Sequence, residues 1–137
     1  MINFRLNTFM IMIRKTYVAL VFFIVLTNVI FASSWKEYYD LMVKSYNENN
    51  FKLGVEWGEK ALEQAVAEFG FNSVEHEKTL FVMIDLYYYT VNLSKTLETA
   101  KLDSIVSKNV YGDASQNYCG SLNNLGLTYY FLGNYST

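Results

Sequence analysis

Apolar residues recur every three to four positions in five stretches after residue 34, which is the spacing of one buried face on an α-helix. The stretches cover residues 35–47, 51–69, about 74–90, about 93–111 and about 114–132. Gly70 favours a helix end after the second stretch, because glycine adopts the left-handed conformation easily. Asn72 or Ser73 can cap the third helix, whose first turn holds Glu75 and Glu77. The chain has no proline and only seven glycines, so the pattern predicts an all-α protein.

Landmark residues return at a constant interval of 42 positions along the chain, which we call the repeat interval. Asn50 and Asn92 are separated by this interval, and each precedes a large apolar residue. Gly70 and Gly112 share it, and each follows an aromatic residue. Asn134 lies one more interval after Asn92. Two further series have the same spacing, namely Tyr46, Tyr88 and Tyr130, and Tyr38, Leu80 and Leu122. Several coincidences at one interval indicate a repeat of two helices, which stack because one pair cannot bury its apolar face alone.

The last copy of this pattern resembles a tetratricopeptide repeat. Leu122, Leu125, Gly126 and Tyr129 follow the spacing of its first helix, with leucine at the first position where the family pattern has tryptophan. Gly133 follows at the expected turn. The resemblance implies that Gly126 lets a partner helix approach closely and that Tyr129 fills the groove between helices. The two earlier copies keep the hydrophobic positions but lose the small residue.

The repeat length points to the longer repeats of the kinesin light chain type within this family. Glu59 to Leu62, Glu68 to Gly70 and then His76 resemble the second helix and linker of those repeats. The implied fold is an α-α superhelix of about two and a half helix pairs within residues 33–137. Its units cover residues about 35–76, 77–118 and 119–137.

The third unit stops where its second helix should begin, so we expect a fragment of a longer array. Its last helix would then leave Leu125, Tyr129 and Leu132 partly uncovered. The alternatives are that this helix is simply exposed, or that it pairs with another chain.

The resemblance also implies a binding surface, because in this family the first helix of each unit lines a concave face that holds peptide ligands. In that geometry one groove is lined by Tyr39, Tyr46, Phe81, Asp85, Tyr88, Asn123 and Tyr130. Tyrosine suits such a surface, since it offers a large apolar area together with a hydroxyl group. The alternative is that these side chains pack between helices, as we expect of Tyr87, which shares the phase of Tyr129.

Residues 1–32 have the pattern of a secretory signal peptide. Arg14 and Lys15 precede an uncharged, apolar run that ends in the small residue Ala32. We therefore expect cleavage after Ala32 and export of the mature chain, which would be periplasmic or secreted. The alternative is an uncleaved membrane anchor, since the uncharged run reaches the lower edge of spanning length. Alternative translation starts are Met10 and Met12.

Charge and composition exclude several classes of function. Residues 1–32 hold three basic side chains and no acid, so the rest of the chain carries a net charge of −5, which argues against nucleic-acid binding. The single histidine, His76, and the single cysteine, Cys119, cannot assemble a metal site of the Cys/His type. We interpret His76 as a solvated linker residue and Cys119 as a small packing residue. No catalytic, cofactor-binding or metal-binding residue is predicted.

Together these features predict an exported scaffold that binds a protein or peptide partner through the concave face of its helix pairs and catalyses no reaction itself. The alternative is an N-terminal regulatory or sensor segment of a longer signalling protein or enzyme, truncated at Thr137. A membrane is expected as a partner only if the N-terminal segment stays uncleaved.

Overall fold

The computed structural model describes residues 34–134, which form five α-helices and contain no strand. The helices are α2 (Trp35–Asn47), α3 (Phe51–Phe69), α4 (Val74–Tyr89), α5 (Leu93–Tyr111) and α6 (Gln116–Asn134). The all-α prediction is therefore confirmed for this part of the chain, and the bounds match the predicted stretches closely. The predicted signal peptide with its cleavage site, the alternative starts and the last three residues lie outside the described residues.

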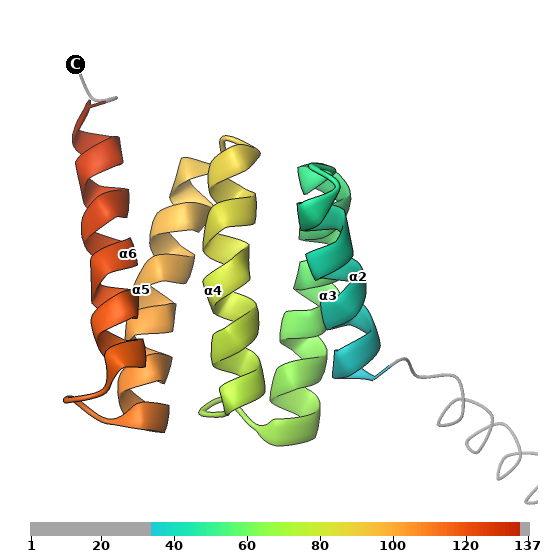
Figure 1. Cartoon of the computed structure of the whole chain (residues 1–137), viewed down its shortest axis with the longest axis horizontal. Helices are drawn as coiled ribbons and strands as arrows, with labels where there is room; N and C mark the ends of the chain where they lie inside the picture. The colour runs from blue at the N-terminus through green and yellow to red at the C-terminus, as the bar shows by residue number, and fades with distance from the viewer. Residues whose placement is uncertain (1–33, 135–137) are drawn as a thin grey trace, which may run out of the picture. The chain divides into compact units, whose positions relative to one another are not determined.

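The helices pack in chain order, and α2 also contacts α4. Figure 1 shows α2, α4 and α6 toward the viewer, with α3 and α5 behind them, so the helices form two layers. We call the surface of α2, α4 and α6 that faces the viewer the front face. None of the helices α2 to α6 is long and apolar enough to cross a membrane.

The turns between helices repeat their geometry at the repeat interval. Asn49 and Val91 both have positive φ angles, 57° and 59°, and each lies just before the helix that follows. Gly70 and Gly112 end α3 and α5 with φ angles of 91° and 86°. A β-branched residue such as Val91 rarely adopts a positive φ, and here the turn has two backbone hydrogen bonds, from the Val91 N–H to the Tyr88 carbonyl and from the Asn92 N–H to the Tyr87 carbonyl. The predicted helix end at Gly70 is confirmed.

The core lies between α2, α3 and α4 and is built on Met42, Met83, Leu86 and Tyr87. Tyr87 is 5% exposed, so its predicted core position is confirmed. The small residues that let the helices approach are on α3. A Cβ atom added to Gly58 would lie 2.9 Å from the Met42 sulfur and still closer to the Met83 sulfur.

The buried face of α5 has the same spacing as that of α3 but is more polar. On α3 the buried residues are Gly54, Gly58, Ala61 and Ala65. The residues one repeat interval later, also buried, are Thr96, Ala100, Asp103 and Ser107. Asp103 is fully buried, and neither of its oxygens has a hydrogen-bond partner within the described residues. Burial raises the pKa of Asp103 to about 6, and the nearby Ser121 hydroxyl offsets this only in part.

Three predictions for α6 are wrong. Tyr129 does not fill a groove, because its side chain is 49% exposed. A Cβ atom at Gly126 would meet no atom within 4 Å, so this glycine permits no close approach. Gly133 makes no turn, since it lies inside α6. For Tyr129 and Gly126 the reason is that no described helix covers this side of α6. The predicted partial exposure is confirmed for all three residues, since Tyr129 is 49% exposed and Leu125 and Leu132 are of intermediate exposure.

His76 is not the solvated linker residue that we predicted. It lies in the first turn of α4 and is 3% exposed. Its backbone N–H donates to the Ser73 hydroxyl, which confirms Ser73 as the N-cap. Its Nδ1 lies 2.6 Å from the Phe71 carbonyl oxygen, so Nδ1 carries the proton and donates to that oxygen. The imidazole therefore links the start of α4 to the turn that precedes it.

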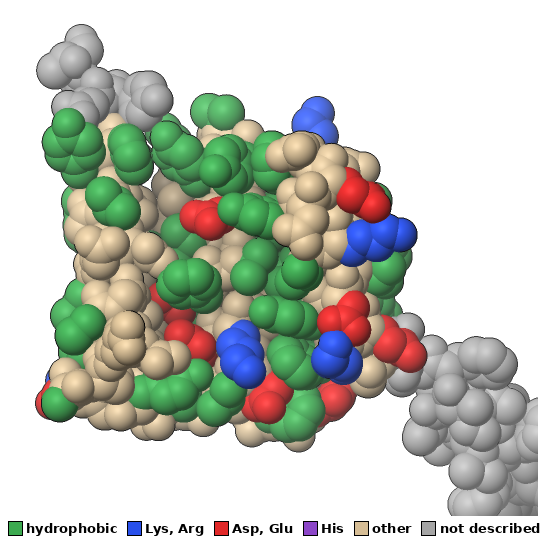
Figure 2. All heavy atoms as spheres, in the orientation of Figure 1, with side chains coloured by type: hydrophobic (Ala, Val, Ile, Leu, Met, Phe, Trp, Pro, Cys, Tyr) green, Lys and Arg blue, Asp and Glu red, His purple; other side chains and the backbone are tan. Residues whose placement is uncertain are grey.

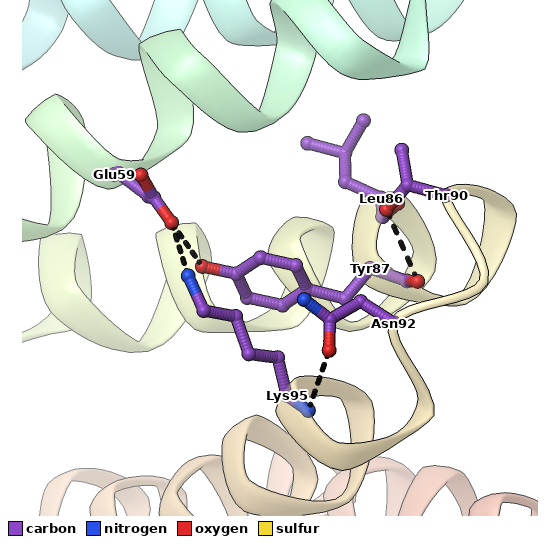
Figure 3. Close-up of polar contacts among 6 residues, drawn as sticks. All are labelled: Glu59, Leu86, Tyr87, Thr90, Asn92 and Lys95. Carbon is purple, nitrogen blue, oxygen red and sulfur yellow. Dashed lines mark hydrogen bonds and ion pairs between the residues drawn. The ribbon is translucent and has the colours of Figure 1, made fainter.

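A polar contact among three side chains joins three consecutive helices (Figure 3). Glu59 of α3 accepts hydrogen bonds from the Tyr87 hydroxyl at 3.1 Å and from the Lys95 ammonium of α5. The Lys95 ammonium also lies over the Tyr87 ring, 4.9 Å from its centroid. The Lys95 hydrogen bond lowers the pKa of Glu59, whereas burial, with the Glu59 charge, raises the pKa of Tyr87 to about 12.

Replacing Tyr87 with phenylalanine is expected to lower the free energy of unfolding by about 0.5–1.5 kcal/mol, because one buried hydrogen bond is lost while the ring stays. Urea unfolding monitored by circular dichroism measures this change. The matched control is Tyr38→Phe, since the Tyr38 hydroxyl makes no hydrogen bond to the described part of the chain. Its expected change is under about 0.5 kcal/mol. Equal changes for the two variants would show that the Glu59 contact contributes no stability.

Candidate binding groove on the front face

Three hollows follow one another across the front face. The first, of about 390 Å³, lies between α4 and the start of α6. The second, of about 290 Å³, lies between α2 and α4. The third, of about 140 Å³, lies between α4 and the end of α6. Tyr39, Phe81 and Val82 line both the first and the second hollow, and Asp85 lines both the second and the third. Neighbouring hollows therefore adjoin one another, and we call them together the front groove.

Five of the seven predicted site residues line the front groove. They are Tyr39, Tyr46, Phe81, Asp85 and Tyr88. The structure brings these side chains of α2 and α4 together, as the repeat register predicts. Figure 2 shows hydrophobic side chains gathered over the middle of this face, with charged side chains between them.

Asn123 and Tyr130, the two predicted residues of α6, do not line the groove. Asn123 is exposed, and the Tyr130 side chain is 65% exposed. The next residue along the helix lines the third hollow in each case, namely Asn124 and Phe131. The reason is that α4 has a hollow on both sides, whereas α6 contributes only the side that faces α4. Leu127, which also lines this hollow, could have been found from the register, since it lies one repeat interval after Asp85.

Aromatic rings form a continuous row at one end of the front groove. The row contains Phe51, Tyr46, Tyr89, Tyr88, Phe131 and Tyr130, so it runs over α3, α2, α4 and α6. The ring centroids of Phe51 and Tyr89 are 4.5 Å apart, and those of Tyr88 and Phe131 are 5.3 Å apart. Tyr89 is half-exposed. We call this row the aromatic band, and it presents both ring faces and hydroxyl groups.

Carboxylates outnumber cations in the lining of the front groove. The charged residues that line it are Glu77, Lys78 and Asp85. Glu77 is 4% exposed and accepts a hydrogen bond from the Tyr111 hydroxyl at 3.1 Å. Asp85 accepts one from the Tyr46 hydroxyl at 3.2 Å. Burial raises the pKa of both carboxyl groups. Burial, with the Asp85 charge, also raises the pKa of Tyr46 to about 12.

Potential metal ligands do not cluster in the described part of the chain. Within residues 34–134 no group of three or more His, Cys, Asp or Glu side chains could hold a metal ion. Cys119 is exposed, so its predicted role as a packing residue is wrong. It lies on the first half of α6, whose buried positions within the described residues are instead small and polar, as at Ser121. The arrangement of the front groove suits binding by shape and polarity.

No protein-family model matches the chain, and the comparisons with curated proteins and with solved structures found no similar protein. The argument for function therefore starts from the front groove itself.

Proposed function

We propose that the chain is a tetratricopeptide-like helical-repeat scaffold that binds an extended or helical segment of a protein partner in the front groove. The observation that carries the proposal is a row of three adjoining hollows across α2, α4 and α6 with aromatic residues in their lining, namely Tyr39, Tyr46, Phe81, Tyr88 and Phe131. Exposed aromatic side chains in hollows are typical of surfaces that bind partners. The recurrence of the turn geometry at the repeat interval supports the repeat fold. The scaffold is proposed to act after export, which the pattern of residues 1–32 favours.

The groove can be tested with a library of random twelve-residue peptides, selected on the full-length chain. Peptides recovered on the unmodified chain are expected to bind the Phe81→Ala,Tyr88→Ala double variant at least tenfold more weakly, as measured by fluorescence anisotropy. Both side chains line the groove, Phe81 at 44% exposure, so their removal takes away contact area without opening the core.

Tyr129→Ala is the matched control, because this tyrosine is 49% exposed and lies on the side of α6 away from the groove. It is expected to leave the peptide affinities unchanged. Equal binding to the double variant, with its helical circular dichroism intact, would refute the proposal. Recovery of no peptide above background would also refute it.

A second candidate function follows from the uncovered side of α6. Leu122 and Tyr129 are 44% and 49% exposed, whereas Leu80 and Tyr87, at the same positions of α4, are 1% and 5% exposed. We propose as the alternative that a further helix covers Leu122 and Tyr129, and that the chain acts as the N-terminal regulatory segment of a longer signalling protein or enzyme. Expression of the natural gene product and measurement of its mass would decide between the two.

A further inference from the structure

Asp85 holds a central place in the front groove. It is the residue that the second and third hollows share, so anything that fills both must pass its carboxylate. The rings of Tyr46, Tyr88 and Tyr89, which line these two hollows, belong to the aromatic band. Asp85 is therefore the carboxylate that lies beside aromatic side chains in both of these hollows, whose lining is otherwise uncharged.

The Asp85 carboxylate lacks a cation. No Lys, Arg or His of residues 34–134 lies within ion-pair distance of it, since the four ion pairs of this part of the chain involve other acids. Its hydrogen bond comes from the neutral Tyr46 hydroxyl. A carboxylate can accept about four hydrogen bonds, so acceptor sites remain. The Asp85 side chain is exposed, so a cation that enters the groove can reach its carboxylate and form a charge-assisted hydrogen bond with it.

The rings beside Asp85 favour the same kind of ligand. Tyrosine faces attract cations, and a guanidinium group both stacks on a ring and donates two parallel hydrogen bonds to a carboxylate. The hollows on either side of Asp85 are lined by apolar residues, including Val43 and Phe81 on one side and Leu127 and Phe131 on the other. The net charge of −5 after residue 32 attracts a basic segment over a longer range as well.

We propose that the partner of the front groove is a segment with a central arginine or lysine that pairs with Asp85, flanked by apolar residues that fill the hollows on both sides. This inference rests on the proposed function and adds the chemical class of the partner. Arginine is preferred over lysine, because its planar guanidinium group can stack on a tyrosine ring and donate hydrogen bonds to the Asp85 carboxylate at the same time.

The selection with random twelve-residue peptides tests this inference when it is run in parallel on the full chain and on its Asp85→Asn variant. Asparagine has nearly the same shape and still accepts the Tyr46 hydrogen bond, but it carries no charge. Arginine and lysine are expected to be enriched at least threefold over the input library on the unmodified chain. The Asp85→Asn variant is expected to show no enrichment. Asp113→Asn, which removes a charge paired with Lys108 outside the groove, is the matched control and should keep the enrichment.

A recovered peptide then allows a double-variant cycle. Replacing its arginine with citrulline keeps the shape and removes the charge, and the citrulline peptide is expected to bind the unmodified chain at least tenfold more weakly. The same two peptides should bind the Asp85→Asn variant within twofold of each other. Peptides that require Phe81 and Tyr88 but show no enrichment of arginine or lysine would overturn this inference and leave the proposed function standing. If no peptide requires those two residues, the inference and the proposed function both fail.

Discussion

Replacing Leu80 with alanine is expected to lower the free energy of unfolding by about 2–5 kcal/mol, the usual cost of emptying a leucine site in a core. Leu80 is 1% exposed on α4, so its truncation leaves a cavity among packed neighbours. The same substitution at Leu122, the equivalent position of α6, is expected to lower the free energy of unfolding by less than about 1 kcal/mol. Leu122 is 44% exposed and loses far less contact.

This pair of variants is well matched, because both residues lie inside a helix and both lose the same atoms, so the change in helix propensity is the same. Chemical unfolding in urea of the two full-length variants measures the difference. A loss at Leu122 as large as that at Leu80 would mean that this side of α6 is covered in solution. If the loss of unfolding free energy in Leu122→Ala also depended on protein concentration, a second copy of the chain would be the partner that covers this side of α6.

Local signals made most of the fold predictable. Gly70 and Gly112 mark helix ends because their φ angles of 91° and 86° suit glycine. Asn92 begins a helix because its side chain accepts a hydrogen bond from the Lys95 N–H. These features depend on residues close together in the chain, so the sequence contains all the information that they need. The observed helix bounds therefore lie close to the predicted ones.

The groove was predictable on α2 and α4 and less so on α6. Positions separated by the repeat interval, such as Tyr46 and Tyr88, both line it because α2 and α4 are each followed in the front layer by another helix on the same side, namely α4 and α6. Tyr130 has the same phase but a different environment, since α6 has a neighbour in the front layer on one side only. Periodicity gives the phase of a residue on its helix. It does not tell which sides of that helix are covered.

The sequence interpretation also missed where small and polar residues are buried. Gly126 fits the family pattern, yet the close approach is made by Gly54 and Gly58 of α3, against Leu86 and Met83. Gly54 and Gly58 are one helical turn apart, which was visible in the sequence and could have indicated a packed helix face. His76 lies among charged residues, and only its contact with the Phe71 carbonyl explains its burial. Such a contact depends on the turn before α4, which composition does not reveal.

Asp103 makes the stability of the chain depend on pH. Its pKa of about 6 in the folded chain lies above the ordinary value of 3.8, because burial without a partner disfavours the charged form. Below about pH 4 the group is protonated in both the folded and the unfolded chain, so it contributes no pH dependence. As the pH rises from about 4 to about 6 the unfolded chain loses the proton first, and stability falls. The total loss is about 3 kcal/mol, and it stays constant above that range.

The Asp103→Ala variant is therefore expected to be more stable than the unmodified chain at pH 7, by about 1–3 kcal/mol. The site accepts alanine, since Ala61 is fully buried at the corresponding position of α3. Urea unfolding at pH 4 and pH 7 should show a fall in stability for the unmodified chain and a smaller one for the variant, in which the raised pKa values of Glu77 and Asp85 still contribute. The control is Asp40→Ala, also inside a helix but exposed and paired with Lys36, which should keep the pH dependence of the unmodified chain. If Asp103→Ala were instead less stable at pH 7, the cavity that it leaves and the lost interaction with the Ser121 hydroxyl would outweigh the cost of burying the carboxylate, and the prediction would be wrong.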